Sequence, residues 1–303
     1  MAAFQKSVSF GQSWPAVKRS INRQITGYLF ILPQLVLFFV FLLYPIIEGF
    51  RLSFYNVQVF GSRFVGFQNY VNVFQDPIFI HALYNTLFFI VSIVVLTVVF
   101  AIFVAAAIFD KSEAYISLIR GSYYLPVIVS MTVMSMVWAI ILNPAGGLVN
   151  YISSRLGGGD IDLLGSPTSV MPVIIVLTFM VNVGQAIILY IAAFISIPPE
   201  ILEAAEVDGA NRWVRFRKIL LPLSNSTTLY VTVTNIIAVL KIFVIIQLLT
   251  AGGPSNASVT LMYYMYQKAF QFNQVGQGCA VGIIMFVIAL LLSIPTFKLI
   301  KTE

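Results

Sequence analysis

The chain has 303 residues, of which 59% are apolar and only 9% are charged. Soluble domains carry roughly 25% charged residues, so this composition excludes an ordinary water-soluble enzyme, and its apolar content excludes a disordered chain. The single Cys and single His exclude a disulfide framework and most zinc chemistry, and the net charge of +6 has to be judged by its distribution.

Six apolar stretches are long enough for a helix that crosses a bilayer, which needs about 20 residues. They cover residues 27–47, 82–108, 125–142, 170–195, 227–250 and 279–300. None alternates apolar and polar residues as a barrel strand does, so the sequence predicts an all-α membrane protein, a polytopic bundle of six transmembrane helices. The first stretch is too long for a typical secretory signal, and we expect it to be retained. The chain then consists of a tail, residues 1–26, and one membrane domain, residues 27–303.

The basic residues are distributed unevenly over the predicted loops. The tail, the second and fourth loops and the C-terminus together hold twelve Lys and Arg residues, whereas the loops on the other side hold four. Cytoplasmic loops carry the excess of Lys and Arg, so both termini are predicted to face the cytoplasm of a bacterial inner membrane. The positive charge is thus a signal of topology, and we expect lipid rather than nucleic acid around the chain.

The sequence lacks the motifs of common catalytic sites. It contains no phosphate-binding loop of the form G-x-x-x-x-G-K-[ST], no H-E-x-x-H and no G-x-S-x-G. The acidic residues lie outside the apolar stretches or at their edges, which disfavours a proton relay. His81 and Cys279 suit ordinary helix-end and packing positions. We therefore expect no catalytic residue, no metal site and no cofactor in this chain.

The most highly charged segment joins the fourth and fifth stretches and covers residues 197–222. Its acidic residues come first and its basic residues later, and Pro198 and Pro199 suit the start of a helix. Gly209 suits a helix end with positive φ, and Asn211 suits the cap of a second helix that Pro222 closes. The pattern predicts two short helices with a bend, which by composition alone is also typical of a solvated amphipathic loop.

The spacing within this segment resembles the EAA loop of ABC importer permeases. Glu203-Ala204-Ala205 is followed by Gly209 and then by Ile219, Leu221 and Pro222, which match every anchor of that loop. Three further stretches are similar to the carbohydrate-uptake branch of the maltose and glycerol-phosphate permeases: residues 64–70, 123–150 and 248–270. The resemblance runs from about residue 28 to residue 300.

The resemblance implies a particular assembly. It consists of this permease, a second and different permease, two ATPase subunits that bind ATP and Mg, and an external solute-binding protein that delivers a carbohydrate. The helix of the EAA loop would sit in a cleft of the ATPase. The coupling residues are then Glu203, Ala204, Ala205, Asp208 and Gly209.

In this family the spans that flank the EAA loop line the substrate path. Their polar residues here are Asn182 and Gln185 on the fourth span and Asn235, Lys241 and Gln247 on the fifth. Asn182 and Gln185 are three residues apart and share a helical face, which suits either sugar hydroxyls or hydrogen bonds between helices. Lys241 suits either an ion pair within the protein or contact with an acidic sugar.

Two alternatives remain beside the carbohydrate permease. One is an ABC permease for a non-sugar solute, which the stretches at 64–70 and 248–270 disfavour. The other is a stand-alone secondary carrier, which the scarcity of buried carboxylates and the EAA loop disfavour.

Overall fold

The computed structural model describes residues 28–58 and 61–299, so the tail predicted for residues 1–26 lies outside the described range. The chain divides into two compact units, Met1–Leu52 and Ser53–Glu303. Helices make up most of the described residues, and the strands described form one two-stranded antiparallel hairpin.

The described part of the first unit is one apolar helix, Tyr28–Leu52. Its middle is a π-helical turn, η1 (Phe39–Leu43), and α2 (Tyr44–Leu52) follows without a break. None of its most apolar window is buried inside the structure. A helix that is apolar all round and exposed suits contact with lipid, as predicted for the stretch at 27–47.

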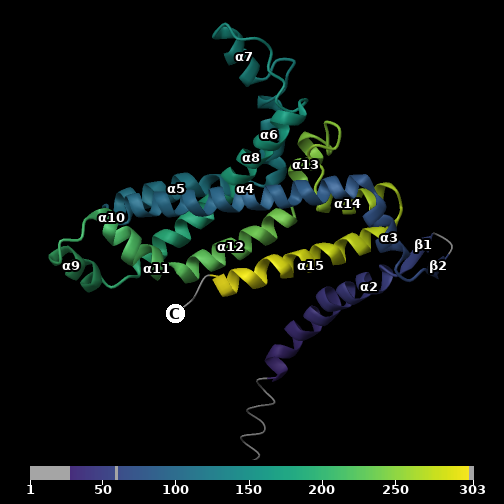
Figure 1. The fold of residues 1–303 in the computed structure, drawn as a ribbon, viewed down its shortest axis with the longest axis horizontal. Helices are drawn as coiled ribbons and strands as arrows, with labels where there is room; N and C mark the ends of the chain where they lie inside the picture. Colours follow the sequence, from purple (N-terminus) through teal and green to yellow (C-terminus); the bar gives the residue numbers. More distant parts are fainter. Residues whose placement is uncertain (1–27, 59–60, 300–303) are drawn as a thin grey trace, which may run out of the picture. The chain divides into compact units, whose positions relative to one another are not determined.

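The second unit consists of helices and one β-hairpin (Figure 1). Its elements, in chain order, are β1 (Tyr55–Gln58), β2 (Gly61–Phe64), α3 (Gln68–Gln75), α4 (Pro77–Ile108), α5 (Glu113–Ile128), α6 (Met131–Ile141), α7 (Leu148–Arg155), α8 (Pro167–Ile195), α9 (Pro199–Val207), α10 (Arg212–Arg215), η2 (Phe216–Leu220), α11 (Leu221–Leu223), α12 (Asn225–Leu240), α13 (Val244–Leu249), α14 (Leu261–Tyr266), η3 (Gln267–Gln271) and α15 (Val275–Leu299).

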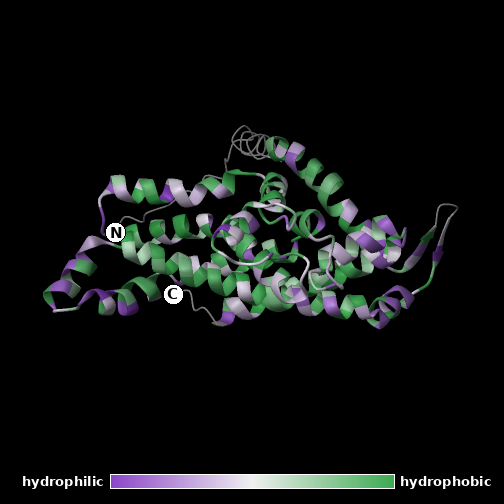
Figure 2. Cartoon of the chain, turned by 90° about the horizontal axis from the view of Figure 1, so that it is seen from above, coloured by the Kyte–Doolittle hydropathy of each residue, from purple (hydrophilic) through white to green (hydrophobic). Residues whose placement is uncertain are grey.

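Four helices of the described residues are long and apolar enough to cross a membrane, and two bent helix pairs raise the number to six. The four are Tyr28–Leu52, Pro77–Ile108, Pro167–Ile195 and Val275–Lys298. In Figure 2 green predominates along the long helices of the second unit, whereas purple gathers at the segment that carries α9. This arrangement agrees with the predicted polytopic bundle.

The third and fifth predicted spans are wrong as continuous helices. The stretch at 125–142 is divided between α5 and α6, which meet at an angle of 90°. Ser130 starts α6 by accepting a hydrogen bond from the Val133 N–H, and hydropathy alone does not reveal such a cap. The stretch at 227–250 breaks after Leu240, and the Thr260 hydroxyl donates to the carbonyl of Ile242 at the break, 3.0 Å away. A side chain from a distant segment thus satisfies backbone that the break exposes.

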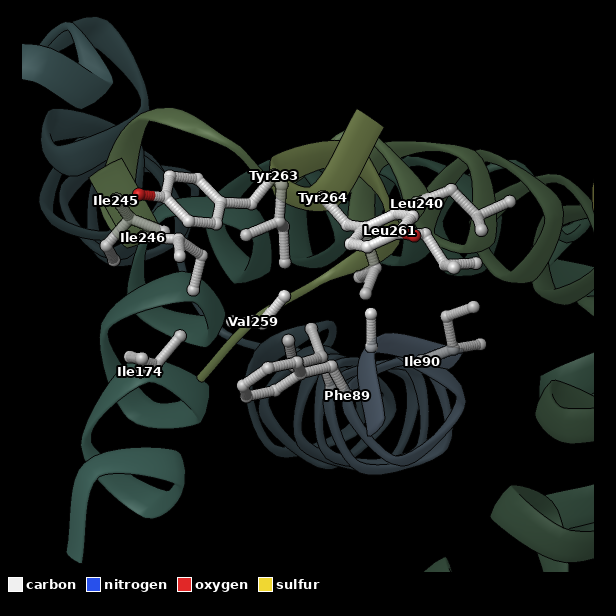
Figure 3. Packing of buried hydrophobic residues seen from close by; sticks show 14 of the residues in the cluster. Phe89, Ile90, Ile174, Leu240, Ile245, Ile246, Val259, Leu261, Tyr263 and Tyr264 are labelled. Carbon is white, nitrogen blue, oxygen red and sulfur yellow. The ribbon is translucent and has the colours of Figure 1, made fainter. Parts of the chain in front are cut away.

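Two hydrophobic clusters hold the second unit together. The larger lies where α4, α8, α12, α13 and α14 meet, and Figure 3 shows Phe89 and Ile90 of α4 facing Leu261 and Tyr264. The smaller joins the C-terminal halves of α4 and α8 to α5 and η2. Tyr190 and Phe194 of α8 are fully buried in it. The second cluster supports the end of the unit that carries α9.

Candidate functional site

The predicted two-helix hairpin is present at one end of the second unit (Figure 1). Its first arm, α9, begins at Pro199 after Pro198 and has Glu200 in its first turn. Gly209 follows with φ +78°, and the Ala210 N–H donates to the Ala205 carbonyl, 2.9 Å away. A residue in the left-handed region just after a helix is the common way for a helix to end, so the predicted role of Gly209 is confirmed.

The second arm starts where the sequence predicts and ends close to the predicted position. The Asn211 side chain caps it by accepting a hydrogen bond from the Val214 N–H at 2.9 Å. The arm then continues as α10, η2 and α11 to Leu223, and the chain bends by 64° before α12. Pro222 is the second-last residue of the arm, so the arm ends one residue beyond the proline.

The outward surface of α9 carries both acidic and apolar side chains. Every residue of α9 is at least partly exposed, and Glu203 and Ala204, like Asp208 and Gly209 beyond the helix end, are exposed, whereas Ala205 is intermediate. Val207 is 88% exposed. The two neighbouring alanines, Ala204 and Ala205, leave the backbone of α9 open to close approach.

Two ion pairs that sequence reasoning missed hold the hairpin in place. Arg215 Nη1 lies 3.1 Å from Glu206 Oε2, which joins the two arms. Arg212 Nη2 lies 2.6 Å from Asp110 Oδ2, which joins the second arm to the end of α4. Opposite charges in the predicted second and fourth loops were the available signal, but nothing in the sequence specified their pairing.

Three of the five predicted path residues come together between α8 and α12. Asn182, Gln185 and Asn235 line a cavity of about 60 Å³, together with Thr234 and four apolar residues. None of the described residues that line the cavity is charged. The cavity is therefore a polar, neutral site on the two helices that flank the hairpin.

The carboxamides of this cavity keep free capacity for hydrogen bonds. Asn182 Nδ2 donates to the Thr178 carbonyl and Asn235 Nδ2 to the Val231 carbonyl, each 2.8 Å away along its own helix. Asn235 Oδ1 is buried and has no partner in the described residues. A buried acceptor without a partner costs about 1–3 kcal/mol, so this oxygen is suited to a water molecule or a ligand hydroxyl.

The other two predicted path residues lie elsewhere. Lys241 follows the last residue of α12 at the break, is exposed and does not line this cavity. Its position suits the negative end of the α12 dipole. Gln247 lies on α13, which packs against α6. Its Oε1 is buried without a partner in the described part of the chain.

The segment that follows α13 is irregular and is held by α4. Asn85 Nδ2 donates to the carbonyls of Val259 and Asn256, at 3.0 and 3.3 Å. The Leu261 N–H donates to the Thr86 hydroxyl, 2.9 Å away. Irregular backbone lacks the regular partners of a helix, so α4 supplies hydrogen bonds to part of the stretch at 248–270.

A second polar cluster lies where α4 begins. Asp76 caps α4 through the Ile78 N–H at 2.9 Å, and it accepts from Tyr264 at 2.8 Å and pairs with Lys268 at 2.9 Å. Burial alone would raise the pKa of the Asp76 carboxyl, but the hydrogen bonds from Lys268, Tyr264 and the backbone, with the Lys268 charge, together lower it. The cluster fixes η3 and α14 to the first turn of α4.

Comparison with known proteins gives consistent matches over nearly the whole chain. Residues 114–300 match the family described as "Binding-protein-dependent transport system inner membrane component". The chain is 32% identical to the probable ABC transporter permease protein YurN of Bacillus subtilis, covering 93% of this chain and 98% of that protein. It is 31% identical to the lactose transport system permease protein LacF of Rhizobium radiobacter, covering 90% and 92%.

Solved structures agree with these relatives. A bacterial alginate ABC transporter, in complex with a periplasmic protein that holds an alginate pentasaccharide, contains a chain with a TM-score of 0.82 to this one. The two are 27% identical, and the match covers 94% of this chain and 98% of that one. The fold is therefore shared over most of both chains.

Proposed function

Because this chain belongs to the family of binding-protein-dependent transport system inner membrane components and is a permease subunit of an ABC importer, we propose that it carries a sugar or oligosaccharide. The similarity of nearly the whole chain to permeases named for lactose and arabinooligosaccharides, and to a chain of an alginate ABC transporter, is the observation that carries this proposal. The expected partners are a second permease, two ATPase subunits, which bind ATP and Mg, and an external solute-binding protein.

The hairpin around α9 is the proposed contact with the ATPase. Exposed Glu203 and Asp208 offer negative charge to a basic cleft, and Val207 offers apolar area to bury. The Gly209 turn and the Arg215–Glu206 pair keep the two arms in one geometry. A rigid hairpin transmits a displacement, so closure of the ATPase dimer would move the connected helices α8 and α12.

The cavity between α8 and α12 is the proposed part of the substrate path. Carboxamides both donate and accept hydrogen bonds, as sugar hydroxyls do, and the described lining of the cavity is neutral. The two helices that border the cavity, α8 and α12, are the ones that the hairpin around α9 connects. Movement of the hairpin would therefore change the cavity directly, which links ATP hydrolysis to passage of the sugar.

The proposed orientation places the α9 end of the second unit and both termini in the cytoplasm. The unequal number of basic residues, twelve against four, supports this direction. In the same orientation the hairpin of β1 and β2 lies on the outer side, since it is at the opposite end of the second unit from α9 (Figure 1).

The test uses the complete importer, reconstituted in vesicles with its ATPase subunits, second permease and binding protein. Uptake of lactose, an arabinooligosaccharide and an alginate pentasaccharide is measured together with ATP hydrolysis. We expect the intact importer to take up at least one of these carbohydrates only with ATP present. Uptake that persists without the ATPase subunits would favour a secondary carrier, and no carbohydrate uptake would contradict the proposed substrate class.

Glu203→Lys tests the contact with the ATPase in the same vesicles. We expect the variant to insert normally but to import less sugar per ATP hydrolysed. The introduced lysine would be repelled by the proposed basic cleft of the ATPase. Glu113→Lys makes the same change at an exposed position in the first turn of α5, outside the hairpin, and is the control. Normal uptake by the Glu203 variant would contradict the role of α9.

A further inference from the structure

A second and larger cavity lies at the end of the second unit opposite α9. Its volume is about 160 Å³, and β1, α3 and the start of α15 border it. Most of its lining consists of carboxamide side chains: Asn56, Gln68, Asn69, Asn72, Gln274 and Gln277. None of the described lining residues is charged. This concentration of amides on three separate elements has no part in the coupling hairpin or the α8–α12 cavity.

The floor of this cavity is fixed by its own hydrogen bonds. Asn69 is buried, and its Nδ2 donates to the carbonyls of Ser53 and Tyr55 at 2.8 and 2.9 Å. Gln68 Nε2 donates to Asn72 Oδ1 at 2.8 Å. The floor is therefore preorganised, and binding a ligand would not require these side chains to become ordered.

The walls keep polar groups available. In the described residues no side-chain hydrogen bond is formed by Asn56, Gln274 or Gln277. Each carboxamide offers two donor hydrogens and an acceptor oxygen. The cavity can thus match several hydroxyl groups at once while it offers nothing to balance a charge.

One aromatic residue is adjacent in sequence to a residue of the cavity lining. Phe67 directly precedes Gln68, and contacts with Phe54 at 5.3 Å and Tyr70 at 5.9 Å between ring centroids hold it in place. It is nevertheless 70% exposed. Phe67 is not among the residues that line the cavity, so the amides alone define the ligand, one with several neutral hydroxyl groups.

We propose that the carboxamide-lined cavity between β1, α3 and α15 is a receiving subsite that holds one uncharged sugar ring before the ring reaches the α8–α12 cavity. This proposal rests on the proposed function as a carbohydrate permease. Pockets for drug-sized ligands have volumes of about 300–1,000 Å³, so a cavity of this size takes one ring and not a whole oligosaccharide. A ring held here would be less free to return to the outside while the importer changes conformation.

The test removes amides from the wall without changing side-chain length much. Gln274→Met and Gln277→Met are introduced together into the complete importer, and Gln75→Met is the control at an exposed position of α3 outside the cavity. The measurements are the sugar imported per ATP hydrolysed, the ATPase rate with loaded binding protein, and the affinity of the importer for that protein. The sugar is the carbohydrate that the wild-type importer takes up.

We expect the double variant to import about three- to tenfold less sugar per ATP, the loss that corresponds to one or two neutral hydrogen bonds. Its ATPase rate and its affinity for the binding protein should equal those of wild type and of Gln75→Met. Unchanged import would overturn the proposed subsite. Weaker binding of the solute-binding protein would also overturn it, because the cavity would then be a contact for that protein. If the wild-type importer takes up no carbohydrate, the proposed function itself fails, which is a separate result.

Discussion

Arg212 and Asp110 are 102 residues apart in the chain, yet Arg212 Nη2 lies 2.7 Å from one oxygen of the Asp110 carboxylate and 2.6 Å from the other. Asp110 follows the end of α4, and Arg212 begins the second arm of the hairpin. Both side chains are solvent-exposed, by 39% and 58%, so the pair contributes little to stability, about 1 kcal/mol or less. Its consequence is positional, because it ties the hairpin to a helix that also packs against α8 and α12.

The first prediction concerns this pair. Asp110→Arg and Arg212→Asp should each leave the thermal unfolding midpoint nearly unchanged and lower the sugar imported per ATP, because the hairpin loses its connection to α4. The double variant restores an ion pair with reversed charges and should recover most of the coupling. Uptake and ATP hydrolysis in vesicles measure this. Single variants that stay fully coupled would show that the pair is only a surface contact.

The second prediction tests whether Gly209 acts through its backbone conformation or through a direct contact. A Cβ added there meets no atom within 4 Å, so any effect of a side chain comes from the φ of +78°. Gly209→Ala should cost about 1–2 kcal/mol in the turn and reduce coupled uptake, whereas Gly209→Asn should retain more activity because Asn adopts left-handed backbone more readily. Equal loss for Ala and Asn would point to a direct contact at this position instead of backbone geometry.

The hairpin was predictable because local rules determine it. Pro198 and Pro199, Gly209 and Asn211 each act on their immediate neighbours, and the structure places the two helices between them as expected. Helical periodicity placed Asn182 and Gln185 on one face, whereas only the family resemblance placed Asn235 of α12 on the same path.

The bends in the predicted spans could not be read from the sequence. Hydropathy measures composition, and the apolar residues on both sides of Ser130 and of Lys241 form continuous runs. The second break depends on Thr260, which supplies a hydrogen bond to Ile242 from a segment that comes later in the chain. The same holds for the Arg212–Asp110 pair, because long-range contacts of this kind leave no local pattern.

The third prediction concerns the close contact of α5 and α8 at Gly184. A Cβ at this position would clash with the Tyr123 carbonyl oxygen and lie 2.9 Å from Val127 Cγ2. Gly184→Ala should therefore push the two helices apart and destabilise the protein by about 1–3 kcal/mol, the range for an overpacked core. Thermal unfolding in detergent measures this. Gly121→Ala on α5 is the control, since its Cβ meets nothing within 4 Å, and equal midpoints for the two variants would contradict the close contact.

The fourth prediction concerns the ion pair of Asp76 and Lys268, whose side chains are only 18% and 15% exposed. Since folding lowers the pKa of Asp76 from its ordinary 3.8, the carboxylate contributes stability that is present above that pH and is lost as the pH falls through the lower folded value. Asp76→Asn should unfold more easily by about 1–3 kcal/mol at pH 7, the range for hydrogen bonds to a charged group.

The pH dependence and a second variant distinguish this effect from a general packing defect. Unfolding in detergent is followed from pH 7 down to acidic pH. The difference in unfolding free energy between wild type and Asp76→Asn should narrow below pH 3.8, where the Asp76 carboxylate of the wild type becomes protonated. Tyr264→Phe removes one hydrogen bond to Asp76 and leaves the ion pair, so its effect at pH 7 should be smaller. A difference that stays constant through the acid range would mean that Asp76 acts through its shape and its cap on α4, because a charge-dependent contribution must vanish when the carboxylate is protonated.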